Sequence, residues 1–157
     1  MFYHARNGSV HVGDSRMDYI CFGKGSRKLV MLPGLGDGLT TVKGKALVFA
    51  AMYRAYAREF TVYMFSRKNK LREGYTTREM AEDQVQAMAA LGISKADILG
   101  ISQGGMIAQY LAFDHPELVD RLVLAVTLSR PNETVRHVID SWIRFARQGD
   151  YRALMID

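Results

Sequence analysis

Short apolar runs alternate with segments of helical periodicity along the chain. Apolar and β-branched runs bounded by turn formers predict six strands: Ser9–Val12, Met17–Phe22, Lys28–Leu32, Phe60–Phe65, a run beginning at Ala96, and Arg121–Leu128. Apolar residues at helical spacing predict helices over Lys45–Glu59, from Thr76 to Gly92, from Gln103 to Phe113, from Asn132 to Gly149, and a short one near Asp150. Strands that alternate with helices predict a mostly parallel sheet with helices on both faces.

The predicted turn between the Ala96 strand and the next helix carries the pattern Gly100-x-Ser102-x-Gly104. A strand that turns directly into a helix forces the turning residue, Ser102, into a backbone with positive φ. A Cβ two residues before or after Ser102 would collide with neighbouring backbone, which favours glycine at both positions. The pattern is typical of a nucleophile elbow, which exposes a hydroxyl beside the positive end of a helix. The alternative is a glycine-rich turn with an ordinary serine.

A second glycine-rich segment, Pro33-Gly34-Leu35-Gly36-Asp37-Gly38, follows the predicted strand Lys28–Leu32. Its glycines allow the backbone to approach a bound group closely. The segment lacks the Gly-Lys-Ser/Thr ending of a phosphate loop and the G-x-G-x-x-G pattern of a dinucleotide site, which argues against a nucleotide. A plain turn is the other alternative. We interpret Asp37 as a turn former rather than as a catalytic carboxylate.

The chain has 157 residues, of which 48% are hydrophobic and 24% charged, as expected of one soluble domain with a sizeable core. Its net charge of +5 comes without a long Lys/Arg block, which argues against a nucleic-acid partner. We interpret the basic stretch Ser66–Arg72 as a solvated loop, with contact to an anionic substrate group as the alternative. The single cysteine, Cys21, excludes an intrachain disulfide. Met1–Val10 has no signal-peptide core and no run is apolar enough to span a membrane, so we expect a cytoplasmic protein.

Three segments together resemble the α/β-hydrolase superfamily: Pro33-Gly34-Leu35-Gly36, Gly100-Ile101-Ser102-Gln103-Gly104-Gly105, and His115-Pro116-Glu117-Leu118-Val119 with the apolar strand that follows. The resemblance runs from about Ser9 to the end of the chain. It implies an α/β-hydrolase sheet truncated after the sixth strand, with residues 1–130 as the N-terminal part of the core. The helix from Asn132 resembles the start of the helical cap that many members insert here, which assigns residues 131–157 to that cap.

The resemblance also assigns roles to single residues. Ser102 is the implied nucleophile, and Gly100 and Gly104 are the elbow glycines. The backbone N–H groups of Leu35 and Gln103 are the implied donors of the oxyanion hole. We expect no metal and no other cofactor.

The base and the acid that a serine nucleophile needs are expected outside this chain. In this superfamily they follow the nucleophile in the order Asp or Glu, then His, and both normally lie beyond the cap. His4 and His11 precede the core strands, and His115 at the far end of the elbow helix fits as a C-terminal cation. Only His137, in the predicted cap helix, is considered as a substitute base, while Glu133 fits as a first-turn carboxylate of that helix.

We therefore predict the N-terminal part of an esterase-like serine hydrolase that acts on a small-molecule ester or acyl substrate. The alternatives are a non-hydrolytic member, such as an acyltransferase or ligand-binding protein, and an interaction module whose sheet pairs with another chain. A dehalogenase is disfavoured because its nucleophile would be an aspartate at the position of Ser102. Because Arg121–Leu128 would be an unpaired edge of the sheet, the isolated chain is expected to self-associate. Because it lacks a base for Ser102, it is expected to be nearly inactive.

Overall fold

The computed structural model describes residues 2–38 and 40–156, which form two compact units, 1–127 and 128–157. Within the described residues, six strands form one sheet in the first unit: β1 (Arg6–Val12), β2 (Ser15–Gly23), β3 (Arg27–Leu32), β4 (Phe60–Lys68), β5 (Ala96–Ile101) and β6 (Val119–Ala125). The strand order is β1-β2-β4-β3-β5-β6. Strand β2 is antiparallel to β1 and β4, whereas β4, β3, β5 and β6 run parallel. The predicted mostly parallel sheet is confirmed.

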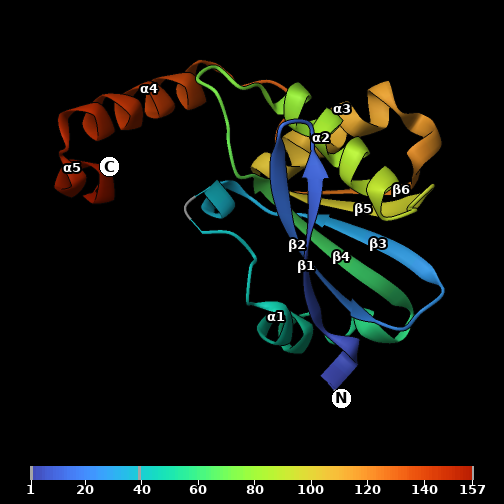
Figure 1. The fold of residues 1–157 in the computed structure, drawn as a ribbon. Helices are drawn as coiled ribbons and strands as arrows, with labels where there is room; N and C mark the ends of the chain where they lie inside the picture. Colours follow the sequence, from blue (N-terminus) through green and yellow to red (C-terminus); the bar gives the residue numbers. More distant parts are fainter. Residues whose placement is uncertain (1, 39, 157) are drawn as a thin grey trace. The chain divides into compact units, whose positions relative to one another are not determined.

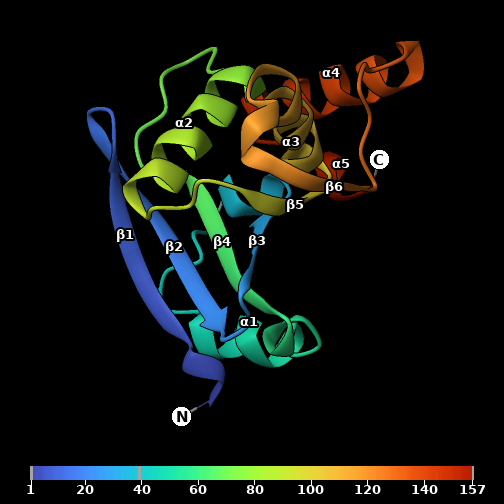
Figure 2. The ribbon, with the colours of Figure 1, turned by 90° about the vertical axis from the view of Figure 1, so that its right-hand side faces the viewer.

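Helices cover both faces of this sheet (Figures 1 and 2). Helices α2 (Thr77–Ala90) and α3 (Gln103–Asp114) lie on one face, and α1 (Ala46–Met52) lies on the other. In the described part of the unit, 3₁₀ turns occupy η1 (Phe2–His4), η2 (Leu35–Gly38), η3 (Tyr56–Arg58) and η4 (Pro116–Leu118). The second unit consists of α4 (Glu133–Gln148) and α5 (Tyr151–Ile156).

The alternation of side chains along β3 explains why its buried part, Leu29–Leu32, is apolar at every position. Val30 and Leu32 belong to the apolar cluster that includes side chains of α2 and α3, whereas Leu29 and Met31 belong to the cluster that includes side chains of α1. Successive side chains of a strand point to opposite faces, so a strand covered on both faces is apolar at every position. This burial places the carboxyl end of β3, and the glycine-rich loop after it, in the middle of the sheet.

Several helix ends lie where local signals placed them. Thr76 and Glu79 form a capping box, because the Thr76 hydroxyl accepts from the Glu79 N–H and the Glu79 carboxylate accepts from the Thr76 N–H. In the second unit the Asn132 side chain accepts from the Val135 N–H at 2.9 Å, and Gly149 ends α4 with φ of 70°. These three boundaries confirm the sequence prediction.

Several predicted elements have different limits in the structure. The strand expected over Arg121–Leu128 lies at Val119–Ala125, and two other elements differ in extent. The helix expected over Lys45–Glu59 stops at Met52 and is followed by η3, whose Ala57 carbonyl accepts from the Lys24 N–H just after β2. The prediction of a loop over Ser66–Arg72 is wrong for its first three residues. Strand β4 continues to Lys68, which pairs with β2.

Candidate active site

Ser102 occupies the turn between β5 and α3 and has φ of 53° and ψ of −121°, which confirms the predicted positive φ. Its N–H donates to the Ala125 carbonyl at the end of β6, at 3.0 Å. Its carbonyl accepts from the Gly105 N–H at 2.9 Å and from the Thr127 hydroxyl at 2.7 Å. With the backbone held on both sides, the Ser102 side chain remains exposed.

The two elbow glycines allow α3 to lie directly against the sheet. A Cβ added to Gly100 would lie 2.6 Å from the Cα of Gly105. A Cβ added to Gly104 would lie 1.9 Å from the carbonyl oxygen of Leu32, the last residue of β3. No side chain fits at such distances, so the close approach of α3 to β3 and β5 requires glycine at both positions.

The glycine-rich loop after β3 lies beside Ser102. A Cβ added to Gly34 would lie 3.3 Å from the Ser102 Cβ and 3.7 Å from its Oγ. Leu35 follows as the first residue of η2, and Gln103 is the first residue of α3, where helix N–H groups lack partners within the helix. The structure thus brings together all five residues that the sequence proposed for the site, while their chemical roles stay predictions.

Asp37 lies in the 3₁₀ turn η2, where its N–H donates to the Gly34 carbonyl at 3.2 Å, as predicted for a turn former, and it is also buried. One carboxylate oxygen accepts from the Ser66 hydroxyl at 2.9 Å and the other from the Arg67 N–H at 2.7 Å. The Ser66 Oγ in turn accepts from the Val42 N–H at 2.9 Å. Burial raises the pKa of Asp37, and these hydrogen bonds, with the Arg67 charge, oppose the rise. Asp37 therefore connects the loop to the carboxyl end of β4.

Arg67 is the residue that sequence reasoning missed, because its basic neighbours suggested a solvated loop. Its side chain is only 5% exposed. The Nη2 atom donates to the Pro33 carbonyl at 2.7 Å and to Gln103 Oε1 at 3.1 Å, whereas Nε and Nη1 have no hydrogen-bond partner among the described residues. Burial lowers the pKa of Arg67, and the Asp37 charge opposes this effect. A charged residue at the end of an apolar strand was the available signal.

The histidines of the first unit lie away from Ser102. His4 and His11 lie before and within β1, which is separated from β5 by three strands of the sheet. His115 caps the far end of α3, where its Nε2 lies 2.8 Å from the Glu82 carboxylate, which raises the pKa of His115. His137 and Glu133 belong to α4 in the second unit. Glu133 is an acidic residue of the first turn, as predicted, whereas the role considered for His137 stays a prediction.

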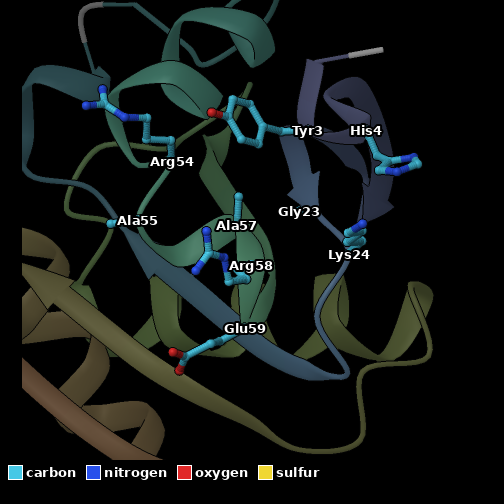
Figure 3. A pocket seen from close by; sticks show the side chains of 9 residues that line it. All are labelled: Tyr3, His4, Gly23, Lys24, Arg54, Ala55, Ala57, Arg58 and Glu59. Carbon is cyan, nitrogen blue, oxygen red and sulfur yellow. The ribbon is translucent and has the colours of Figure 1, made fainter.

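Two cavities of the first unit differ in their position on the sheet. A cavity of about 300 Å³ lies between the carboxyl ends of β3 and β5 and the start of α1, and its lining includes Pro33, Gly34, Ile101 and Lys45. A larger one, of about 890 Å³, lies where β2 ends and β4 begins (Figure 3). Open α/β sheets bind ligands outside the carboxyl ends of their strands, and the smaller cavity lies at that end, lined by Gly34 and by Ile101, the residue before Ser102.

The described residues contain neither a cluster of metal ligands nor a membrane-spanning helix. In residues 2–38 and 40–156, no group of three or more His, Cys, Asp and Glu side chains is placed to hold a metal ion. None of the helices in those residues has the length and apolar character that crossing a bilayer requires.

Comparison with known proteins gives consistent matches. A family model described as alpha/beta hydrolase fold matches residues 29–155. "Putative carbamate hydrolase RutD" of Caulobacter vibrioides is 31% identical over 122 residues, which are 73% of this chain and 43% of the relative. "Epoxide hydrolase 1" of Caenorhabditis elegans is 26% identical over 133 residues, 84% of this chain and 33% of its own. The crystal structure of MGS-M2, an enzyme from a deep-sea metagenome library, matches with a TM-score of 0.80 at 22% identity, over 94% of this chain and 54% of its own. The chain thus spans less than half the length of the carbamate hydrolase and epoxide hydrolase relatives.

Proposed function

Because the chain belongs to the α/β-hydrolase fold family, we propose that it is the N-terminal part of a serine hydrolase whose nucleophile is Ser102. The observation that carries the proposal is the exposed Ser102 at a positive-φ turn, with the Pro33–Leu35 loop against it. Non-glycine residues adopt such a backbone at a cost, and this strain clusters at functional sites. A glycine-rich turn with an ordinary serine would not require a second loop so near that a Cβ on Gly34 would lie 3.7 Å from the Ser102 Oγ.

In the proposed reaction the Ser102 Oγ forms a bond to the carbonyl carbon of the substrate, and its proton passes to a base. The π electrons of the carbonyl move to its oxygen, which receives hydrogen bonds from the N–H groups of Leu35 and Gln103. Collapse of this oxyanion expels the leaving group, which takes up the proton, and water then releases the acyl group by the same steps. We propose that the base, and the acid that orients it, lie in a segment equivalent to the part of the longer relatives that this chain does not cover.

The proposed substrate is a small molecule with an ester or related acyl group. The names of the two curated relatives refer to a carbamate and an epoxide. Of these, only the carbamate has a carbonyl carbon for serine and an oxygen that becomes an oxyanion, so we include carbamates in the proposed class. The proposal involves no cofactor, places the protein in the cytoplasm, and takes residues 131–157, with α4, as the start of a cap.

The test uses the complete gene product and p-nitrophenyl esters of short acids. Ser102→Ala should lower kcat by about a thousandfold or more, because only binding and oxyanion stabilisation remain. Ser94→Ala is the matched control, since Ser94 is exposed in the turn before β5 at the opposite end of that strand. Unchanged turnover by Ser102→Ala refutes the assignment.

The 157-residue chain alone provides a second test of the same proposal. Treated with a fluorophosphonate, it should show negligible labelling of Ser102, because a serine hydroxyl without a base is a weak nucleophile. Peptide mass spectrometry measures the labelled fraction. Rapid labelling would show that a base lies within the chain, and His137→Gln would then be the first variant to examine.

A further inference from the structure

We propose that Arg67 is a positioning residue that holds the two backbone donors of the oxyanion hole in register with each other. The inference rests on the proposed function, since it concerns the same site. Its basis is that one buried guanidinium nitrogen hydrogen-bonds both segments that carry those donors, the Pro33–Leu35 loop and the start of α3. Arg67 itself touches no substrate in this proposal.

The contacts lie next to the donors in the chain. The Pro33 carbonyl, which accepts from Arg67 Nη2 at 2.7 Å, belongs to the peptide unit just before the one that contains the Leu35 N–H. Gln103 provides the other donor through its backbone, while its side-chain oxygen accepts from the same Nη2 at 3.1 Å. A shift of the guanidinium would therefore move both donors, and the distance between them depends on it.

Arg67 is itself fixed by the other side of the loop. Its backbone N–H donates to Asp37 at 2.7 Å, and Asp37 also accepts from Ser66, the preceding residue of β4. Leu35 thus lies between two residues, Pro33 and Asp37, that are both hydrogen-bonded to Arg67. A loop attached at both ends to the end of a central strand keeps its middle N–H in one place without reorganisation.

The burial of the charge agrees with this role. A buried cation is costly unless it is paired and hydrogen-bonded, and here Asp37 lies within the same hydrogen-bond network. The Nε and Nη1 atoms gain no partner in the described residues, so stability alone gives little reason for an arginine. The positive charge beneath the loop also favours the negative oxygen that develops during acyl transfer.

The experiment measures steady-state kinetics of the complete gene product with a p-nitrophenyl ester, and inhibition by a trifluoromethyl ketone. That ketone forms a bond from its carbonyl carbon to the Ser102 Oγ, its oxygen becomes an oxyanion, and the serine proton passes to the base. Arg67→Met should lower kcat by about a hundredfold with KM changed less than threefold, because misplaced donors affect the transition state more than the ground state. The inhibition constant of the ketone should rise by the same factor as kcat/KM falls.

A second variant tests the link without removing the buried charge. Gln103→Met keeps the backbone N–H but removes the side-chain acceptor, and it should lower kcat and the ketone affinity together by about tenfold. Arg54→Met is the matched control, because Arg54 is exposed at the other end of the sheet, in the cavity of Figure 3. Far-UV circular dichroism confirms that each variant is folded.

The outcomes separate this inference from the proposed function. If wild-type protein hydrolyses the ester through Ser102 but Gln103→Met and folded Arg67→Met keep kcat within threefold, only the role of Arg67 is overturned. A fall in kcat without a matching loss of ketone affinity also overturns it, since a general structural defect would produce that result. If Ser102→Ala is as active as wild type, both proposals fail together.

Discussion

Replacing Gly104 by alanine tests how closely α3 must lie against β3. The added Cβ would lie 1.9 Å from the Leu32 carbonyl oxygen and 2.6 Å from that of Pro33. Ordinary contacts at a Cβ are 3.4–4 Å, so the two backbones must separate by roughly 1.5 Å. Both neighbours are backbone atoms at the end of a central strand, and no side-chain rotation relieves the contact.

The magnitude follows from two opposed terms. Overpacking of this kind in a well-packed core costs about 1–3 kcal/mol, or more where backbone must move. Alanine in place of glycine within a helix returns at most about 1 kcal/mol. We expect Gly104→Ala to lower the free energy of unfolding by about 2 kcal/mol or more, because the clash is with backbone and takes the upper end of the first range. It should also abolish ester hydrolysis, because the first turn of α3 moves away from the loop.

Urea unfolding of the complete gene product, followed by far-UV circular dichroism, measures the change in stability. Gly36→Ala is the matched control, since a Cβ at Gly36 meets no atom of the described residues within 4 Å, and it should stay within about 0.5 kcal/mol of wild type. A Gly104→Ala protein as stable as the control would refute the close packing of α3 described above.

Two further predictions concern pH and self-association. The Glu82 carboxylate raises the pKa of His115 above 6.5, so the pair stabilises the fold fully below about pH 6.5, and this contribution is lost as pH rises through the folded-state pKa. The unfolding free energies of wild type and Glu82→Gln should therefore differ at about pH 5.5 and converge by about pH 9, and a difference that grows with pH would contradict the assignment. The isolated 157-residue chain should form dimers or larger species in light scattering, because β6 is at an edge of the sheet and Val123 is 55% exposed. Val123→Lys should lower the measured mass, and a wild-type chain that is monomeric at all concentrations would refute the edge argument.

Local sequence signals were sufficient to predict helix limits and turns where the contacts involve only residues close in sequence. The capping box of Thr76 and Glu79 and the limits of α4 at Asn132 and Gly149 depend on residues within four positions of each other. The positive φ of Ser102 was also predictable, because a strand that passes directly into a helix restricts the backbone of the turning residue, but Ala125 and Thr127 from a distant segment also hold this turn. The order of strands and helices followed from periodicity, which reflects burial on one or both faces.

The tertiary structure alone decided the surroundings of Arg67 and Asp37. In sequence Arg67 stands in a basic run, and its contacts, Pro33 and Gln103, lie 34 and 36 residues away. The sequence predicts Asp37 only as a turn former, and the hydrogen bonds that it accepts from Ser66 and from the Arg67 N–H depend on the position of β4. A charged side chain is buried only where hydrogen-bond partners from other strands offset the cost of removing it from water. Spacing along one segment carries no information on those partners, whereas the parallel sheet assembles them at the carboxyl ends of β3, β4 and β5.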